Sequence, residues 1–150
     1  MAAASAGYSA RTLPDKLGYR PGQRALFIAL PPELSDLTAS VKFGSITLKH
    51  AWDSPLPARS FDPIHAFTTA RADLERHLPE LQGALDRSGM MWVSWPKKAS
   101  KVATDVTEDR VREAALRLDL VDVKVAAIDA IWSGLKLVIR KERRGNAHRA

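Results

Sequence analysis

A short apolar run followed by a basic loop constrains the fold of this chain more than any other stretch. Residues 89–95 are apolar apart from Ser94 and too few for a buried helix, and Pro96 ends the run. The polar loop that follows carries Lys97, Lys98, Ser100 and Lys101. We therefore predict a central strand of an α/β sheet with a basic loop at its carboxyl end, the edge at which open α/β sheets bind ligands.

Patterns along the rest of the chain predict the order β-α-β-β-α-β-α-β-β. The other strands are expected at residues 24–30, 45–49, 61–67, 120–128 and 135–140, and the helices at residues 33–40, 74–85 and 105–118. Pro79 predicts a kink or two short helices in the second helical segment, and Asp105 or Thr107 is expected to cap the third. The turn at Ser133-Gly134 predicts an antiparallel final pair. The fold class is a three-layer α/β fold, mostly parallel, that ends in an antiparallel β-hairpin.

Length and charge divide the chain into one domain and two ends. The 150 residues suffice for one ordinary core, and the net charge of +6 arises entirely from residues 1–20 and 140–150. We expect a flexible segment at residues 1–12, a single domain at residues 13–142 and a basic tail at residues 143–150. Because the intervening stretch is neutral, specific nucleic-acid binding is not expected, although weak attraction of the tail to phosphates stays open.

Composition excludes several classes of site. The chain has no cysteine, which excludes disulfide scaffolds, thiol catalysis and thiolate metal sites and fits a reducing cytoplasm. It shows no export signal and no apolar stretch approaching ~18 residues, so we expect a cytoplasmic protein without a membrane span. The four histidines lack metal-ligand spacing, so no metal site is expected, and His65 is predicted to pack in the core.

The basic loop is the candidate ligand site. The expected ligand-binding residues are Lys97, Lys98, Ser100, Lys101, Ser94 and Trp132. Lysine ammonium groups and the amino end of the following helix favour an anion, and Trp132 beside the hairpin turn is a candidate contact for a ligand or partner. The structural alternative is a solvated loop between two elements. Trp92 and Trp95 are expected on opposite faces of their strand, with one or both in the core.

Two families share features with this sequence. The strands at residues 61–65 and 89–93, with the helix after each and the closing hairpin, resemble the C-terminal half of class I S-adenosylmethionine-dependent methyltransferases. That resemblance implies a Rossmann-like, methyltransferase-like fold. At closer range, residues 92–98, 102–106 and 132–139 resemble an uncharacterised bacterial family, domain of unknown function 3052. This second resemblance covers most of the chain and implies no particular activity.

The chain departs from the methyltransferase pattern where the cofactor would bind. The first strand of those enzymes ends in a glycine-rich loop, because only glycine lets the backbone approach the cofactor closely. Here residues 30–35 read Leu-Pro-Pro-Glu-Leu-Ser, and no Gly-x-Gly occurs anywhere. The one acidic candidate for ribose binding, Asp53, lies beyond a weak strand. We therefore expect no cofactor and no catalytic residues.

These observations favour a non-catalytic binding or regulatory module. Its expected partners are a small anionic or nucleotide ligand, and a protein partner or a second copy of the chain. The first alternative is an S-adenosylmethionine- or nucleotide-dependent enzyme with an unusual loop at residues 30–35. The second alternative is a protein-interaction module that uses the Trp132 hairpin or a free sheet edge.

Overall fold

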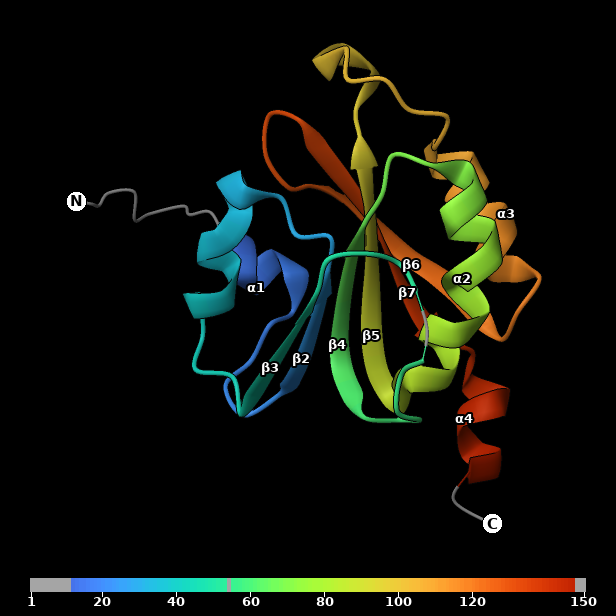
Figure 1. Cartoon of the computed structure of the whole chain (residues 1–150). Coiled ribbons are helices and arrows are strands. Elements are labelled where there is room, and N and C mark those ends of the chain that lie inside the picture. The colour runs from blue at the N-terminus through green and yellow to red at the C-terminus, as the bar shows by residue number, and fades with distance from the viewer. Residues whose placement is uncertain (1–11, 54, 148–150) are drawn as a thin grey trace.

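A six-stranded mixed sheet with helices on both faces forms the molecule (Figure 1). The computed structural model describes residues 12–53 and 55–147, the last three of them by backbone alone, so the expected flexible segment lies outside the described residues except for Thr12. The strands are β2 (Arg24–Ile28), β3 (Ser45–Lys49), β4 (Phe61–Phe67), β5 (Leu85–Pro96), β6 (Leu120–Ala127) and β7 (Trp132–Ile139). The α-helices are α1 (Leu13–Leu17), α2 (Arg71–Ala84), α3 (Glu108–Leu116) and α4 (Lys141–Ala147), and the 3-10 helices are η1 (Pro32–Ala39) and η2 (Lys98–Ser100).

The strand pairing confirms the expected α/β fold. The strand order is β3-β2-β4-β5-β7-β6, in which β3, β2, β4 and β5 run parallel. β7 pairs antiparallel with both β5 and β6, so the sheet ends in the predicted hairpin. Because side chains alternate across a strand, Phe27 packs toward α1 and η1, whereas Leu26 packs toward α2 and α3. Trp92 and Trp95 likewise lie on opposite faces, and both are buried.

Helix α2 runs through Pro79, which rules out one of its two predicted forms. It is one helix of 14 residues that includes Pro79, so the expectation of two short helices is wrong. Leu74 and Leu78 before the proline and Leu81 after it are all buried against the sheet. Burying this stripe offsets the hydrogen bond that proline removes, which costs roughly 3 kcal/mol. None of the described helices is long and apolar enough to cross a membrane.

Hydrogen bonds at the helix starts connect α2 and α3. Thr107 caps α3, as one alternative predicted, because its hydroxyl accepts a hydrogen bond from the amide of Arg110. Asp105 instead accepts a hydrogen bond from the amide of Arg71, in the first turn of α2, at 2.6 Å. The loop before α3 is thereby fixed to the start of α2, next to the carboxyl ends of the strands.

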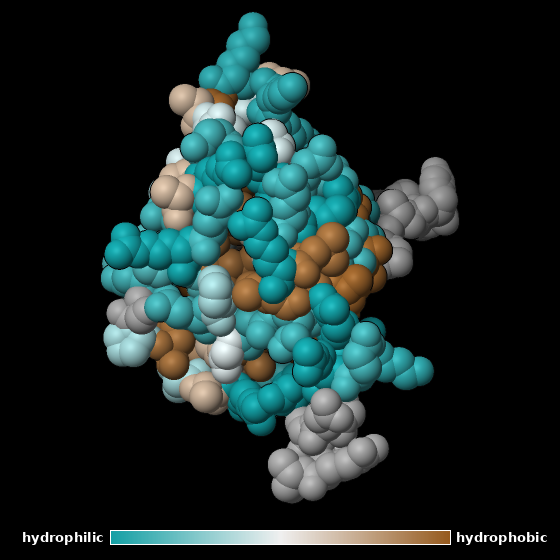
Figure 2. All heavy atoms as spheres, turned by 90° about the vertical axis from the view of Figure 1, so that its right-hand side faces the viewer, coloured by the Kyte–Doolittle hydropathy of each residue, from teal (hydrophilic) through white to brown (hydrophobic). Residues whose placement is uncertain are grey.

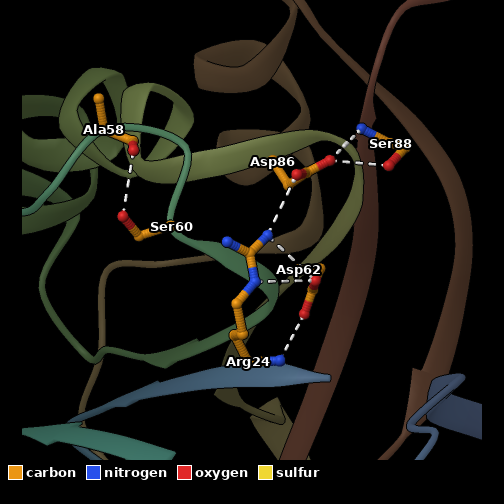
Figure 3. A network of polar contacts seen from close by, with 6 residues as sticks. All are labelled: Arg24, Ala58, Ser60, Asp62, Asp86 and Ser88. Atoms are coloured by element: carbon orange, nitrogen blue, oxygen red, sulfur yellow. Dashed lines mark hydrogen bonds and ion pairs between the residues drawn. The ribbon is translucent and has the colours of Figure 1, made fainter. Parts of the chain in front are cut away.

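A polar clasp joins three neighbouring parallel strands at their amino ends (Figure 3). The guanidinium of Arg24 on β2 pairs with Asp62 on β4 and with Asp86 on β5, at 3.2 and 3.1 Å. Asp86 also accepts hydrogen bonds from the hydroxyl and amide of Ser88. These bonds from Ser88, with a smaller contribution from Arg24, lower the pKa of the Asp86 carboxyl. The clasp fixes the amino ends of the parallel strands and leaves their carboxyl ends free for other roles.

Both edges of the sheet expose apolar side chains. Ile46 and Leu48 on β3 are 44% and 60% exposed, and Val123 and Val125 on β6 are 52% and 44% exposed. On the side of α2 and α3, which Figure 2 turns to the viewer, an apolar band crosses a largely hydrophilic surface. By contrast, β4 is buried over residues 63–67 and β5 over residues 90–96.

A candidate ligand pocket at the carboxyl ends of the parallel strands

The strand order places a topological switch point between β2 and β4. The chain leaves β2 toward β3 on one side of the sheet and returns to β4 on the other side. Connections that diverge in this way leave a crevice beyond the carboxyl ends of the strands, where open α/β sheets bind ligands. A cavity of about 310 Å³ lies there, and we call it the switch-point pocket. It is lined by Ala29, His50, Ala51, Trp52, Phe67, Thr68, Thr69, Asp73 and Trp132.

Three aromatic residues form much of the pocket wall. Trp52 is fixed because its indole N–H donates to the carbonyl oxygen of Phe67 at 2.7 Å. The ring of Phe67 meets that of Trp132 edge to face, with ring centroids 5.3 Å apart and an interplanar angle of 89°. Each of these side chains is at least nine-tenths buried. The wall is therefore rigid and apolar, which suits a flat or apolar part of a ligand.

Ala29 gives the end of β2 an unusual backbone conformation. Its φ angle is 56°, in the left-handed region that favours glycine. The Ala29 amide still donates to the Lys49 carbonyl oxygen at 2.8 Å, so the chain turns away only after this ladder bond. Pro31 and Pro32 then lead into η1. The sharp turn expected of a glycine loop is thus present here without a glycine.

Charged groups around the pocket are few and mostly acidic. Among the lining residues, Asp73 in the first turn of α2 carries a carboxylate, and none is lysine or arginine. Asp53, the acidic candidate for ribose binding, forms an ion pair with Lys49 at 3.1 Å and does not line the cavity. The described residues contain no group of three or more His, Asp or Glu placed to hold a metal ion.

The hairpin turn positions Trp132 at the pocket. The Asp129 carboxylate accepts hydrogen bonds from the amides of Ile131 and Trp132, at 2.9 and 2.7 Å. The ammonium group of Lys97 donates to the Asp129 carbonyl oxygen at 2.7 Å. On the other side, the Trp132 indole N–H lies 3.4 Å from a carboxylate oxygen of Glu33 in η1. Three separate segments therefore hold one aromatic ring in place.

A buried polar chain supports the pocket from below. Tyr19 Oη lies 2.6 Å from His65 Nδ1, and His65 Nε2 lies 2.8 Å from Ser94 Oγ. The His65 ring stacks on Phe67 with centroids 4.2 Å apart. Burial lowers the pKa of His65 to about 3 and raises the pKa of Tyr19. Because all three side chains are buried, this chain of hydrogen bonds is a structural support for the Phe67 wall, and the core position predicted for His65 is confirmed.

The structure does not bring the six predicted ligand residues together. Trp132 lines the switch-point pocket, whereas Ser94 is fully buried beneath it. Lys97 bonds to the hairpin turn, and the Ser100 hydroxyl donates to the Lys97 carbonyl oxygen at 2.6 Å. Lys98 lines a separate cavity of about 260 Å³ with Trp95, Pro96, Thr104, Val106, Thr107 and Glu108. Lys101 ends η2 in a left-handed conformation. A ligand contact of any of these six residues stays a prediction.

Most pocket residues carry no recognisable sequence signal. His50, Thr68 and Thr69 simply follow predicted strands, and Asp73 lies at the start of a predicted helix. A rule that collects the first polar residues after each parallel strand would have found them. Such a rule also needs the strand order, because the order decides which strand ends are neighbours, and the sequence pattern does not give that order.

The similar solved structures decide the fold family. A methyltransferase dependent on S-adenosylmethionine from Aquifex aeolicus is 16% identical, with a TM-score of 0.60 over 84% of this chain and 87% of that chain. The chain has a methyltransferase-like Rossmann fold. Geranyl diphosphate C-methyltransferase from Streptomyces coelicolor A3(2), solved with S-adenosyl-L-homocysteine, is 11% identical, with a TM-score of 0.61 over 85% and 77% of the two chains. The [4+2]-cyclase SpnF is 9% identical, with a TM-score of 0.60 over 83% and 77%.

At these identities the likeness shows the fold and leaves the reaction open. No family model matches the chain, so the resemblance to domain of unknown function 3052 is not confirmed. No curated protein matches it either. The presence of a cyclase beside methyltransferases agrees with the general rule that one fold carries several reactions.

The partners predicted from sequence require correction. The prediction of an anionic or nucleotide ligand, and of a protein partner or a second copy, is wrong. The Aquifex methyltransferase that shares the fold is S-adenosylmethionine-dependent, and the Streptomyces enzyme was solved with S-adenosyl-L-homocysteine. The physical reason lies in the lining of the pocket, where an anion would meet Asp73 and aromatic rings without a lysine or arginine.

Proposed function

We propose that this chain binds S-adenosylmethionine in the switch-point pocket and is an S-adenosylmethionine-dependent enzyme with an atypical cofactor loop. The observation that carries the proposal is the pocket itself, which lies at the switch point of the sheet beside the left-handed turn at Ala29. The shared fold supports the same function. This proposal replaces the non-catalytic module that the missing glycine loop had favoured.

The residues of the pocket fit this cofactor. The left-handed turn at Ala29 supports close approach of the ligand to the backbone, and a methyl side chain adds little bulk there. The Trp52 side of the aromatic wall suits the adenine ring, and the Asp73 carboxylate suits hydroxyl or ammonium donors of the ribose or the amino acid. Neither Pro31 nor Pro32 lines the cavity, so the prolines that replace the glycine loop leave it open.

The chemistry divides between ligand and protein. When bound, S-adenosylmethionine supplies an electrophilic methyl group. Trp52, Phe67 and Trp132 exclude water from one side of the ligand and orient it. Because Asp73 is assigned to the cofactor, His50 is the described lining group left to accept a proton from the methyl acceptor, and we assign general-base action to it.

Calorimetric titration with S-adenosyl-L-homocysteine tests the binding proposal. We expect saturable one-to-one binding by the wild-type chain. Asp73→Asn removes a carboxylate acceptor and should weaken binding about tenfold, because a hydrogen bond to a charged group contributes about 1.5–3 kcal/mol. Lys98→Ala, in the separate cavity, is the matched control and should leave the affinity unchanged.

The outcomes separate the two candidate locations. Absence of binding by the wild type would contradict the proposed function. Binding that depends on Lys98 and not on Asp73 would move the ligand to the basic loop. Release of S-adenosyl-L-homocysteine from S-adenosylmethionine, during incubation with a small-molecule extract of the host, then tests the catalytic part.

A further inference from the structure

We propose that Phe67 and Trp132, with the Glu33 carboxylate beside them, form a subsite for the positively charged sulfonium group of S-adenosylmethionine. The inference rests on the proposed function and goes further, because it assigns one part of the ligand to one corner of the pocket. It predicts that these residues act on the charged cofactor and not on its neutral thioether product.

The two rings provide an aromatic corner within the pocket wall. Their edge-to-face arrangement places both rings along one side of the cavity. His65 covers one face of Phe67 by stacking, and Trp132, which lines the pocket with it, meets the Phe67 ring edge to face. Aromatic faces attract cations, and the attraction increases when water is excluded, as at these nearly buried rings.

The charges around the corner favour a cation. Glu33 reaches the indole of Trp132, and Asp73 lines the same cavity from α2. Lys97 approaches the hairpin turn, but its ammonium group donates to the Asp129 carbonyl oxygen. Among the described residues that line this cavity there is no lysine or arginine, so the Asp73 carboxylate, the Glu33 carboxylate beside Trp132 and the two aromatic rings favour a cation there.

The corner is organised without a ligand. Asp129 holds the Trp132 backbone, and Glu33 holds its indole. The His65 stack fixes Phe67 from below. A preformed corner orders few side chains on binding, so its attraction for a cation contributes directly to affinity.

The test compares affinities for S-adenosylmethionine and S-adenosyl-L-homocysteine, which differ by the methyl group and its positive charge. Titration calorimetry on wild type, Trp132→Leu and Glu33→Gln gives the ratio of the two dissociation constants for each protein. We expect Trp132→Leu to reduce affinity for the charged ligand about tenfold more than affinity for the neutral one. Glu33→Gln should shift the ratio in the same direction by a smaller factor, because Glu33 is exposed.

Two controls separate charge recognition from folding. Asp36→Asn removes another exposed carboxylate of η1 and should leave the ratio unchanged. Trp132→Phe keeps an aromatic ring and should retain most of the wild-type ratio. Thermal melting of each variant identifies a folding defect, and Glu33→Gln, which creates no cavity, keeps the test valid if Trp132→Leu does not fold.

Each result decides the inference. A selective loss for S-adenosylmethionine in Trp132→Leu or Glu33→Gln supports the sulfonium subsite. Equal losses of affinity for both ligands in Trp132→Leu would show that Trp132 is only part of the pocket wall. If Glu33→Gln also left the ratio of the two dissociation constants unchanged, the subsite would be overturned and the proposed function would stand. Wild-type protein that binds neither ligand overturns the proposed function and this inference with it.

Discussion

His65 makes the stability of the domain depend on pH. It is buried between Tyr19 and Ser94, and burial lowers its pKa to about 3, whereas an unfolded histidine titrates near pH 6.5. Below about pH 6.5 the unfolded chain therefore binds a proton that the folded chain does not bind. The contribution of His65 is complete above that pH and falls toward pH 3, by up to about 1.4 kcal/mol per pH unit. Urea unfolding at about pH 7.5, 5.5 and 4.5 should show that the free energy of unfolding decreases as the pH is lowered.

Substitution of His65 measures how much this residue contributes to the pH dependence of the free energy of unfolding. His65→Gln removes the titrating group, so the variant should be less stable than wild type at neutral pH and should lose less stability on acidification. His50→Gln, at an exposed histidine, is the control and should keep the wild-type slope. Equal slopes in wild type and His65→Gln would show that other groups determine acid sensitivity.

At the scale of elements, the turn after β2 stores strain at Ala29. A left-handed φ of 56° disfavours alanine relative to glycine. Ala29→Gly should therefore raise the free energy of unfolding by about 0.5–1 kcal/mol and preserve binding of S-adenosyl-L-homocysteine. Ala39→Gly in η1, where φ is not positive, should instead lower it by a similar amount. Chemical denaturation of both variants checks the contrast, and destabilisation by Ala29→Gly would show that the alanine is not strained.

The sequence predicts the elements of this fold better than it predicts the site. Apolar runs predict the central strands, which are buried on both faces, and a hydrophobic period of 3.6 residues predicts the helices. The continuity of α2 through Pro79 depends on a leucine stripe packed against the sheet, which local propensity does not measure. The bond from Lys97 to the hairpin turn depends on contacts between distant segments. The carboxyl ends of the parallel strands were therefore predictable as a place for a pocket, and the residues that line the pocket were not.

At the scale of the whole molecule, the two ends of the sheet separate stability from binding. The Arg24 clasp lies at the amino ends of the parallel strands, whereas the switch-point pocket lies at their carboxyl ends. Arg24→Gln leaves Asp62 and Asp86 without their cation. Because these groups are partly exposed, the loss should be about 1 kcal/mol, or about 2–4 °C in Tm. Differential scanning calorimetry measures this loss.

The same variant should leave ligand binding intact. S-adenosyl-L-homocysteine at about 100 times its Kd should raise the stability of wild type and of Arg24→Gln equally, by about 2.7 kcal/mol. Arg20→Gln, in the exposed turn before β2, is the matched control and should change neither Tm nor affinity. If Arg24→Gln lowered affinity as well as Tm, the clasp would have to act on the pocket through β2 and β4. An unchanged affinity would establish that the carboxyl ends of the strands form the binding edge independently of the clasp.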